Sequence, residues 1–236
     1  MTDAIVDLRG AVPAPLPKAA REARGLVLSD SNLDELPAGL GELTQLRMLD
    51  VAHNRLAAVP DAIGALRELE VLYLGDNRLA ALPGAIRSLR ALTYLGCDAN
   101  HLETLPEWIG EPEHLVELRL QDNRINRLPP AIARLGGLRA LHLRGNRLTA
   151  LPAELCGLSS LRHLDVRANA LRELPDELGT LARLRVLDLR ANQLTELPAS
   201  LAELPALEKL DLRWNPLASK PRVAAKLEAR GCFVLW

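Results

Sequence analysis

The stretch Leu161–Pro175 reads LRHLDVRANALRELP, and the later stretch Leu184–Pro198 reads LRVLDLRANQLTELP. The two stretches share their Leu, Asn and Pro residues in the same register, while other positions are free to differ, as His163 and Val186 do. Self-similarity at a fixed period indicates similar structural units stacked on one another rather than one irregular core.

The pattern recurs nine times along the 236 residues at a constant period. The apolar residue two positions after the Asn falls at Leu33, Leu56, Leu79, Leu102, Ile125, Leu148, Leu171, Leu194 and Leu217. The spacing never varies, a proline follows four positions later in each unit, and Ser31 replaces the Asn in the first. Each unit therefore reads LxxLxLxxNxLxxLPxxLxxLxx, and its positions are numbered here from the first Leu.

The residue types predict the local structure of each unit. Leu187 and Leu189 alternate with Asp188 and Arg190, as expected of a strand with one buried face. The Asn carries an amide that must find hydrogen-bond partners when buried, and a stack of identical units supplies the same partners at every level. The Leu-Pro pair ends the strand and turns the chain to the opposite side.

On these residues the chain resembles the leucine-rich repeat family over residues 23 to 221. It is most similar to the intracellular 23-residue "LP" type of Ras-group and many bacterial proteins. The resemblance implies an α/β fold: a right-handed β-α solenoid, or horseshoe, with a parallel sheet on its concave face and short helical or 3-10 segments on its convex face.

A solenoid needs capped ends, because its terminal units would otherwise expose their Leu residues. We expect a single domain over 1–236, with an N-terminal cap at 1–22, nine units at 23–217 and a C-terminal cap at 218–236. A short helix is predicted at 17–24. A second helix that stops at Gly231, followed by a terminal strand, is predicted at the other end.

Composition limits the classes of function. Hydrophobic residues make up 48% and aromatic residues only 3%, so the core is expected to be aliphatic. The formal net charge of −1 argues against a general nucleic-acid binder and against electrostatic attachment to a membrane. Three scattered cysteines, no apolar stretch long enough to cross a bilayer and no secretory signal pattern favour a reducing, cytoplasmic location.

Outward strand positions of stacked units form columns on the concave face. In the C-terminal half, position 7 reads Arg144, Arg167, Arg190 and Arg213, beside Asp165, Asp188 and Asp211 at position 5. Either the two columns neutralise each other, or the guanidinium groups stay available for carboxylates or phosphates of a partner. The residues alone leave both interpretations open.

Irregular side chains on a regular scaffold are candidates for binding. The two tyrosines, Tyr73 and Tyr94, lie on neighbouring predicted strands with His53 nearby, and Tyr and Arg are common interface anchors. The predicted partner-binding set is Tyr73, Tyr94, Asp98, Arg119, Gln121, His142, Arg144, His163, Arg167, Arg190, Arg213 and Trp214. The alternative is that these aromatic residues are neutral variation on a solvated sheet.

Two further surfaces have a structural and a functional interpretation. A rim at position 10 comprises Arg55, Arg78, His101, Arg124 and Arg147. It is expected to pair with Asp30, Asp76 and Asp122, or else to attract an acidic partner. On the convex side Pro112 replaces a Leu, so Trp108 either fills the space or marks a second contact site.

The sequence lacks the common catalytic and metal-binding patterns. No Gly-rich phosphate loop of the GxxxxGK[ST] or GxGxxG kind occurs. His142 and His163 lack further ligands for a metal, and Cys97 is predicted to face the core as a small hydrophobic residue. The sequence therefore predicts no enzyme, no cofactor and no metal.

The expected function is non-enzymatic binding of a partner protein on the concave sheet, with a signalling or scaffolding role and a monomer as the default. The alternative is the substrate-recognition part of a bacterial effector that is translocated to a host cytosol. Some effectors of similar repeat type carry a ubiquitin-ligase domain, which this sequence does not contain.

Overall fold

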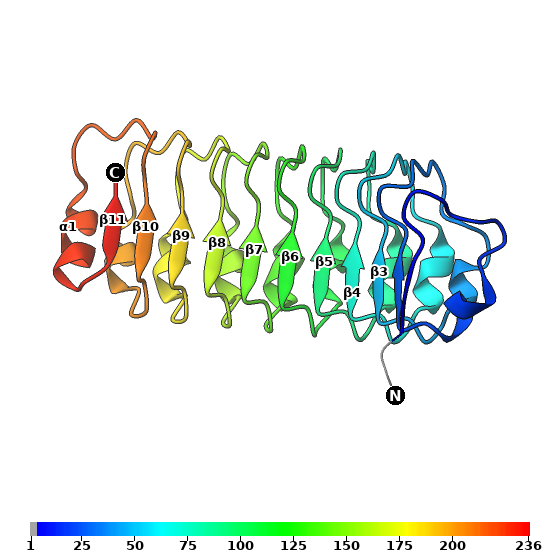
Figure 1. Cartoon of the computed structure of the whole chain (residues 1–236). Coiled ribbons are helices and arrows are strands. Elements are labelled where there is room, and N and C mark those ends of the chain that lie inside the picture. Colours follow the sequence, from blue (N-terminus) through cyan, green and yellow to red (C-terminus); the bar gives the residue numbers. More distant parts are fainter. Residues whose placement is uncertain (1–3) are drawn as a thin grey trace.

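The computed structural model describes residues 4–236 and shows one sheet of parallel strands in chain order (Figure 1). The strands are β1 (Ile5–Asp7), β2 (Gly25–Val27), β3 (Met48–Asp50), β4 (Val71–Tyr73), β5 (Tyr94–Gly96), β6 (Glu117–Arg119), β7 (Ala140–His142), β8 (His163–Asp165), β9 (Val186–Asp188), β10 (Lys209–Asp211) and β11 (Phe233–Leu235). The predicted fold class, a right-handed β-α solenoid, is confirmed.

Short helices lie behind the sheet, one after each strand from β1 to β10, and most begin directly after the proline of the unit (Figure 1). The 3-10 helices span Lys18–Glu22, Leu40–Glu42, Asp61–Ala65, Gly84–Ser88, Glu107–Gly110, Pro130–Arg134, Ala153–Gly157, Asp176–Thr180 and Ala199–Glu203, and the α-helix α1 spans Arg222–Ala229. The proline ring restricts φ to a value that suits the start of a helix, which explains the regular starts.

The core lies between the sheet and the helices and is aliphatic, as predicted. The central residue of each strand pairs with its equivalent in the next unit, as in Leu49 with Leu72 and Leu72 with Leu95. These residues are fully buried in one continuous hydrophobic cluster. Trp108 is half-buried and packs against that cluster beside the buried Pro112, which favours the space-filling interpretation of this side chain.

The repeated Asn residues bind each unit to the one before it. The amide of Asn123, for example, donates to the carbonyl oxygen of Cys97 at 2.9 Å and accepts the backbone N–H of Leu102 at 3.0 Å. The same two links recur at all eight Asn residues of the repeat. Ser31 links its unit to the preceding segment by one hydrogen bond instead of two. Its hydroxyl accepts the N–H of Gly10 and donates to the carbonyl oxygen of Ser29 in its own unit.

The ends agree with the sequence in part. α1, the left-handed Gly231 (φ 89°) and β11 form as expected. The predicted N-terminal helix is a shorter 3-10 turn, and β1 was missed. The assignment of 1–22 and 218–236 as caps around nine units stays our proposal.

Position 8 of the units lies beyond the strand and is a turn residue. Its residues all adopt left-handed backbone conformations, with φ between 51° and 68°. They are Asp30, His53, Asp76, Ala99, Asp122, Gly145, Ala168, Ala191 and Trp214. This residue therefore turns the chain out of the strand just before the buried Asn.

Candidate functional site on the concave face

The concave face is formed by side chains at positions 3, 5 and 7. Position 3 begins each strand and position 5 ends it, so both flank the buried central Leu and point away from the core. Consecutive units lie directly beside one another through parallel pairing. Side chains from several strands can therefore touch in a row along the sheet.

Tyr73 on β4 and Tyr94 on β5 are in contact on this face. Their ring centroids lie 4.8 Å apart with an interplanar angle of 51°, a tilted arrangement that aromatic pairs favour. Gly96 makes room for the Tyr94 ring, because a Cβ at residue 96 would come within 3.1 Å of it. Burial raises the pKa of the Tyr94 phenol to about 12.

The row continues from Tyr94 onto β6. The guanidinium of Arg119 lies 5.7 Å from the centroid of the Tyr94 ring, within the range of a cation–π contact. Arg119 Nε also donates to Glu117 Oε1 at 2.6 Å. Glu117 is absent from the sequence-predicted set, although it holds the guanidinium beside the ring.

Two histidines extend the row onto β7 and β8. Glu117 Oε1 lies 3.6 Å from His142 Nε2, and the rings of His142 and His163 have centroids 5.0 Å apart. Burial, reinforced by the neighbouring His163, lowers the pKa of His142 to about 4. The structure thus joins Tyr73, Tyr94, Arg119, Glu117, His142 and His163 in one row, called here the aromatic row.

The Arg and Asp columns form a separate group on β8 to β10. The guanidinium of Arg190 donates hydrogen bonds of 2.9 and 2.6 Å to the Asp188 carboxylate. Arg213 donates hydrogen bonds of 3.0 and 2.8 Å to the Asp211 carboxylate. Both contacts fit the self-neutralising interpretation. Arg167 is held less tightly, with its nearest carboxylate oxygen, Asp165 Oδ2, at 3.4 Å from Nε.

The other predicted residues lie at position 7 or beyond. Asp98 lies against Gly75, where a Cβ would meet the carboxylate at 3.2 Å. Gln121 Oε1 and the Nε atoms of Arg144 and Arg167 are buried without a hydrogen-bond partner among the described residues. Trp214, at the C-terminal end, is 72% exposed and lies 5.5 Å from the Arg213 guanidinium.

The predicted pairing of the basic rim is wrong. Asp76 accepts His53 Nδ1 at 2.9 Å, and this hydrogen bond raises the pKa of His53. Asp122 instead pairs with Arg144. In the described part of the chain Arg78, Arg124 and Arg147 form no ion pair within 4.0 Å. Asp76 and Asp122 are thus already paired with His53 and Arg144 and do not pair with the rim.

A family model described as leucine rich repeat matches residues 44–102, 113–171 and 163–217. No curated protein matches the chain. Within residues 4–236, no helix is both long enough and apolar enough to cross a bilayer.

Solved structures share the fold. The leucine-rich repeat ectodomain of the receptor kinase GASSHO1/SCHENGEN3 from Arabidopsis thaliana, in complex with CASPARIAN STRIP INTEGRITY FACTOR 2, is 33% identical over 89% of this chain, with a TM-score of 0.76. The plant peptide hormone receptor RGFR1, in complex with RGF2, is 28% identical over 85%, with a TM-score of 0.72. The chain spans 27% and 34% of these two receptor chains.

A bacterial structure is similar in fold alone. An internalin from Listeria monocytogenes is 21% identical, with a TM-score of 0.75 over 91% of this chain and 67% of its own. The family model covers more than half of the sequence, and the repeat register and the Asn links agree with it. The chain belongs to the leucine-rich repeat family.

Proposed function

We propose that the protein is a non-enzymatic recognition module that binds a partner protein through its concave face. The aromatic row carries this proposal, since it places two tyrosines, an arginine and two histidines in mutual contact on a solvated sheet. Tyr, Trp and Arg supply much of the binding energy at protein interfaces. The leucine-rich repeat fold commonly serves protein–protein interaction.

The scaffold supports this function physically. Each strand is fixed by its neighbours and by the Asn links, so the concave side chains lose little backbone freedom when a partner binds. Two structures of similar fold are complexes with a second component: GASSHO1/SCHENGEN3 with CASPARIAN STRIP INTEGRITY FACTOR 2 and RGFR1 with RGF2. By analogy we assign peptide or protein binding to this chain.

Two parts of the surface would act together. We assign the central contact to the aromatic row and to Asp98 and Gln121 beside it. The position-7 guanidiniums Arg144, Arg167, Arg190 and Arg213, together with Trp214, form the C-terminal half of the proposed site. The side chains of Arg144 and Arg167 are 41% and 34% exposed, and Arg167 is only loosely paired, so their exposed guanidinium nitrogens can donate to carboxylates of the partner.

The chemistry of the cysteines supports a non-enzymatic role. Burial raises the pKa of Cys97, Cys156 and Cys232, so none of them is activated as a thiolate nucleophile. Among the described residues no group of three His, Cys, Asp or Glu is arranged to hold a metal ion. The same three free thiols support a reducing, cytoplasmic setting, in which we infer an adaptor role in signalling or scaffolding.

The experiment is a quantitative pull-down with the wild-type chain and two concave-face variants, Tyr73→Ala/Tyr94→Ala and Arg144→Glu/Arg167→Glu. A partner that uses the concave face is expected to be captured by the wild type and lost from both variants. Glu154→Gln, an exposed substitution behind the sheet, is the matched control and is expected to capture normally. Equal capture by all four proteins contradicts the proposal.

A further inference from the structure

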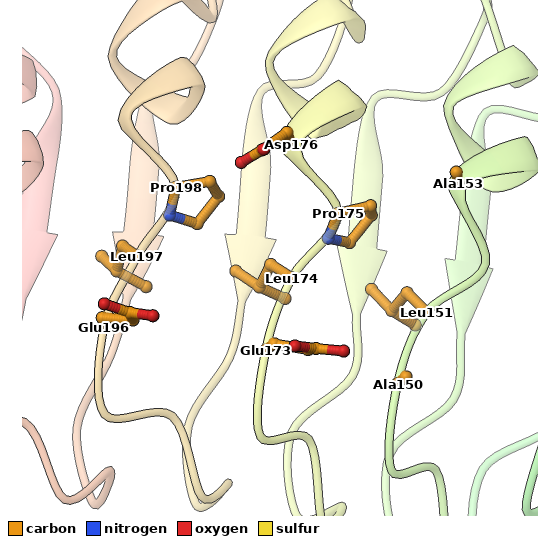
Figure 2. Close-up of a pocket in the computed structure, with 10 residues that line it drawn as sticks. All are labelled: Ala150, Leu151, Ala153, Glu173, Leu174, Pro175, Asp176, Glu196, Leu197 and Pro198. Atoms are coloured by element: carbon orange, nitrogen blue, oxygen red, sulfur yellow. The ribbon is translucent and has the colours of Figure 1, made fainter.

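A groove on the side opposite the sheet offers a second, different binding surface. It is lined by residues of three neighbouring coils, each just before its 3-10 helix (Figure 2). The lining residues are Ala150, Leu151, Ala153, Glu173, Leu174, Pro175, Asp176, Glu196, Leu197 and Pro198. Its volume is about 530 Å³, which is in the size range of ligand-binding clefts.

Two residues of the groove wall are small. Ala150 and Ala153 occupy positions 13 and 16 of their unit, where the next unit carries Glu173 and Asp176. At the base of the groove Leu151 and Leu174 are 5% and 6% exposed and Leu197 is half-buried, so these leucines form an apolar floor beneath the carboxylates. The prolines of the units fix the backbone of the walls.

Three carboxylates lie along this apolar floor without a basic partner. Figure 2 shows Glu173 pointing towards the coil of Ala150 and Leu151, and Asp176 pointing towards the coil of Leu197 and Pro198. Glu173, Asp176 and Glu196 are exposed, and within residues 4–236 no Arg, Lys or His nitrogen comes within 4.0 Å of them. Most carboxylates of the sheet face are paired, so this group is a local excess of negative charge.

The groove is elongated rather than round. Glu196 and Leu197 also line a second hollow of about 330 Å³, which continues towards α1 along Leu217, Pro221 and Val223. Arg222 lies at that far end. The combined surface therefore runs across successive units with an apolar floor, an acidic first part and one basic group at its end.

We propose that this groove binds an extended peptide segment of a partner protein that carries basic residues next to leucine-like residues. The basic side chains lie over Glu173, Asp176 and Glu196, and the apolar ones cover Leu174 and Leu197. Charge complementarity selects this occupant, since the three carboxylates attract Lys or Arg and repel acidic chains. The site is separate from the concave face and does not depend on the function proposed there.

The test uses a defined probe and isotope-labelled protein at low salt. The probe is the peptide acetyl-Gly-Arg-Leu-Arg-Leu-Gly-amide, and its neutral match has Gln in place of both Arg. We expect the basic peptide to shift the amide signals of Ala150, Glu173 and Glu196, and the neutral peptide to bind about tenfold more weakly. Raised salt should weaken the basic peptide in the same direction.

Two triple variants separate local contact from overall charge. Glu173→Gln/Asp176→Asn/Glu196→Gln is expected to weaken binding of the basic peptide about tenfold. Glu154→Gln/Glu177→Gln/Glu203→Gln removes the same charge from carboxylates outside the groove and should leave binding unchanged. Ala150→Trp fills the groove without a change of charge and should abolish the shifts. Tyr73→Ala/Tyr94→Ala should bind the peptide as the wild type does.

Several outcomes overturn the proposal. They are equal binding of the basic and neutral peptides, equal binding by the two triple variants, or shifts confined to the sheet strands. Shifts of the same amides that grow with protein concentration without peptide would assign the groove to a second copy of the chain and would also overturn it.

Discussion

Asp165 on β8 and Asp211 on β10 occupy the same position of their units, yet the fold shifts their pKa values in opposite directions. At both residues burial by itself favours the neutral carboxyl and acts to raise the pKa. At Asp211, which is 1% exposed, the two hydrogen bonds from the Arg213 side chain and the nearby Arg190 outweigh burial and lower the pKa. At Asp165 the looser contact with Arg167 does not, so the pKa stays raised.

Arg213→Gln is therefore expected to raise the pKa of Asp211. In the wild type the folded-state pKa of Asp211 lies below the unfolded value of about 3.9. Its contacts thus stabilise the fold above that pH, and this contribution is lost as pH falls through the folded-state pKa. The variant should therefore have a lower unfolding free energy than the wild type at pH 7. Carboxyl NMR titration and urea unfolding measure the two effects.

Arg147→Gln is the control for that prediction, because this exposed rim arginine contacts no carboxylate among the described residues. It should leave both the Asp211 pKa and the unfolding free energy unchanged. An Asp211 pKa that is the same in Arg213→Gln and wild type would mean that other groups hold the carboxylate ionised.

Asn123→Ala is expected to be among the most destabilising single substitutions in the chain. The substitution removes the links to Cys97 and Leu102 of the preceding unit. It leaves the buried N–H of Leu102 without a partner and leaves the carbonyl oxygen of Cys97 with Asn100 Nδ2 alone, at 3.2 Å. An unsatisfied buried group costs about 1–3 kcal/mol, and with the other lost amide hydrogen bonds we expect a loss of about 3 kcal/mol in urea unfolding. Ser31→Ala removes two hydrogen bonds of a less buried hydroxyl, one from the Gly10 N–H and one to the Ser29 carbonyl, and should cost less than Asn123→Ala, about 1 kcal/mol. Equal losses would show that the Asn ladder has no special role.

The repeat period predicts most of this fold because each Leu, Asn and Pro has one physical task that recurs in every unit. Leu95 is buried, Asn100 links units and Pro106 starts a helix, and the same statement holds for the equivalent residues of both neighbouring units. A period cannot reveal β1, because it lies before the first unit and pairs outside the repeat spacing, as in Ile5 with Gly25.

The site was predictable in position but not in contacts. The repeat register predicts the strands on which Tyr73, Tyr94 and the histidines lie. It did not identify Glu117, which becomes important only because its carboxylate lies between Arg119 and His142. The signal lies in position 3, which holds Glu117 between Tyr94 and His163 in the same column. The left-handed turn at position 8 had weak evidence in the sequence, since Ala and Trp there do not favour it.

Ala168→Gly is expected to stabilise the protein. Ala168 has φ 54°, where a side chain costs about 1–2 kcal/mol relative to Gly. Part of that gain is offset by about 0.4–1 kcal/mol from the greater freedom of Gly in the unfolded chain. A net gain of about 0.5 kcal/mol should be visible in urea unfolding. Gly145→Ala makes the reverse change, and its new Cβ would run into the Asp122 carboxylate, so it should destabilise the fold.

The matched control for the glycine substitution is Ala170→Gly, in the same unit just beyond the buried Asn. Ala170 is not among the residues with positive φ, so Gly there brings only the entropic cost and should destabilise by about 0.5–1 kcal/mol. If both glycine variants changed stability in the same direction, backbone strain at position 8 would not be the cause.

His142 makes the stability of the aromatic row depend on pH. Burial and the neighbouring His163 hold its folded-state pKa at about 4, while the unfolded value is about 6.5. As pH falls from 6.5 towards 4, the unfolded chain binds a proton that the fold does not accept, so unfolding becomes progressively easier. His142→Gln should remove this part of the pH dependence, and His101→Gln, at an exposed rim residue, should retain it. Urea unfolding across this pH range measures the slope. If the unfolding free energy fell with pH equally in wild type and His142→Gln, the imidazole of His142 would be protonated within the folded protein. The contact between His142 and His163 would then have to open while the sheet stays folded.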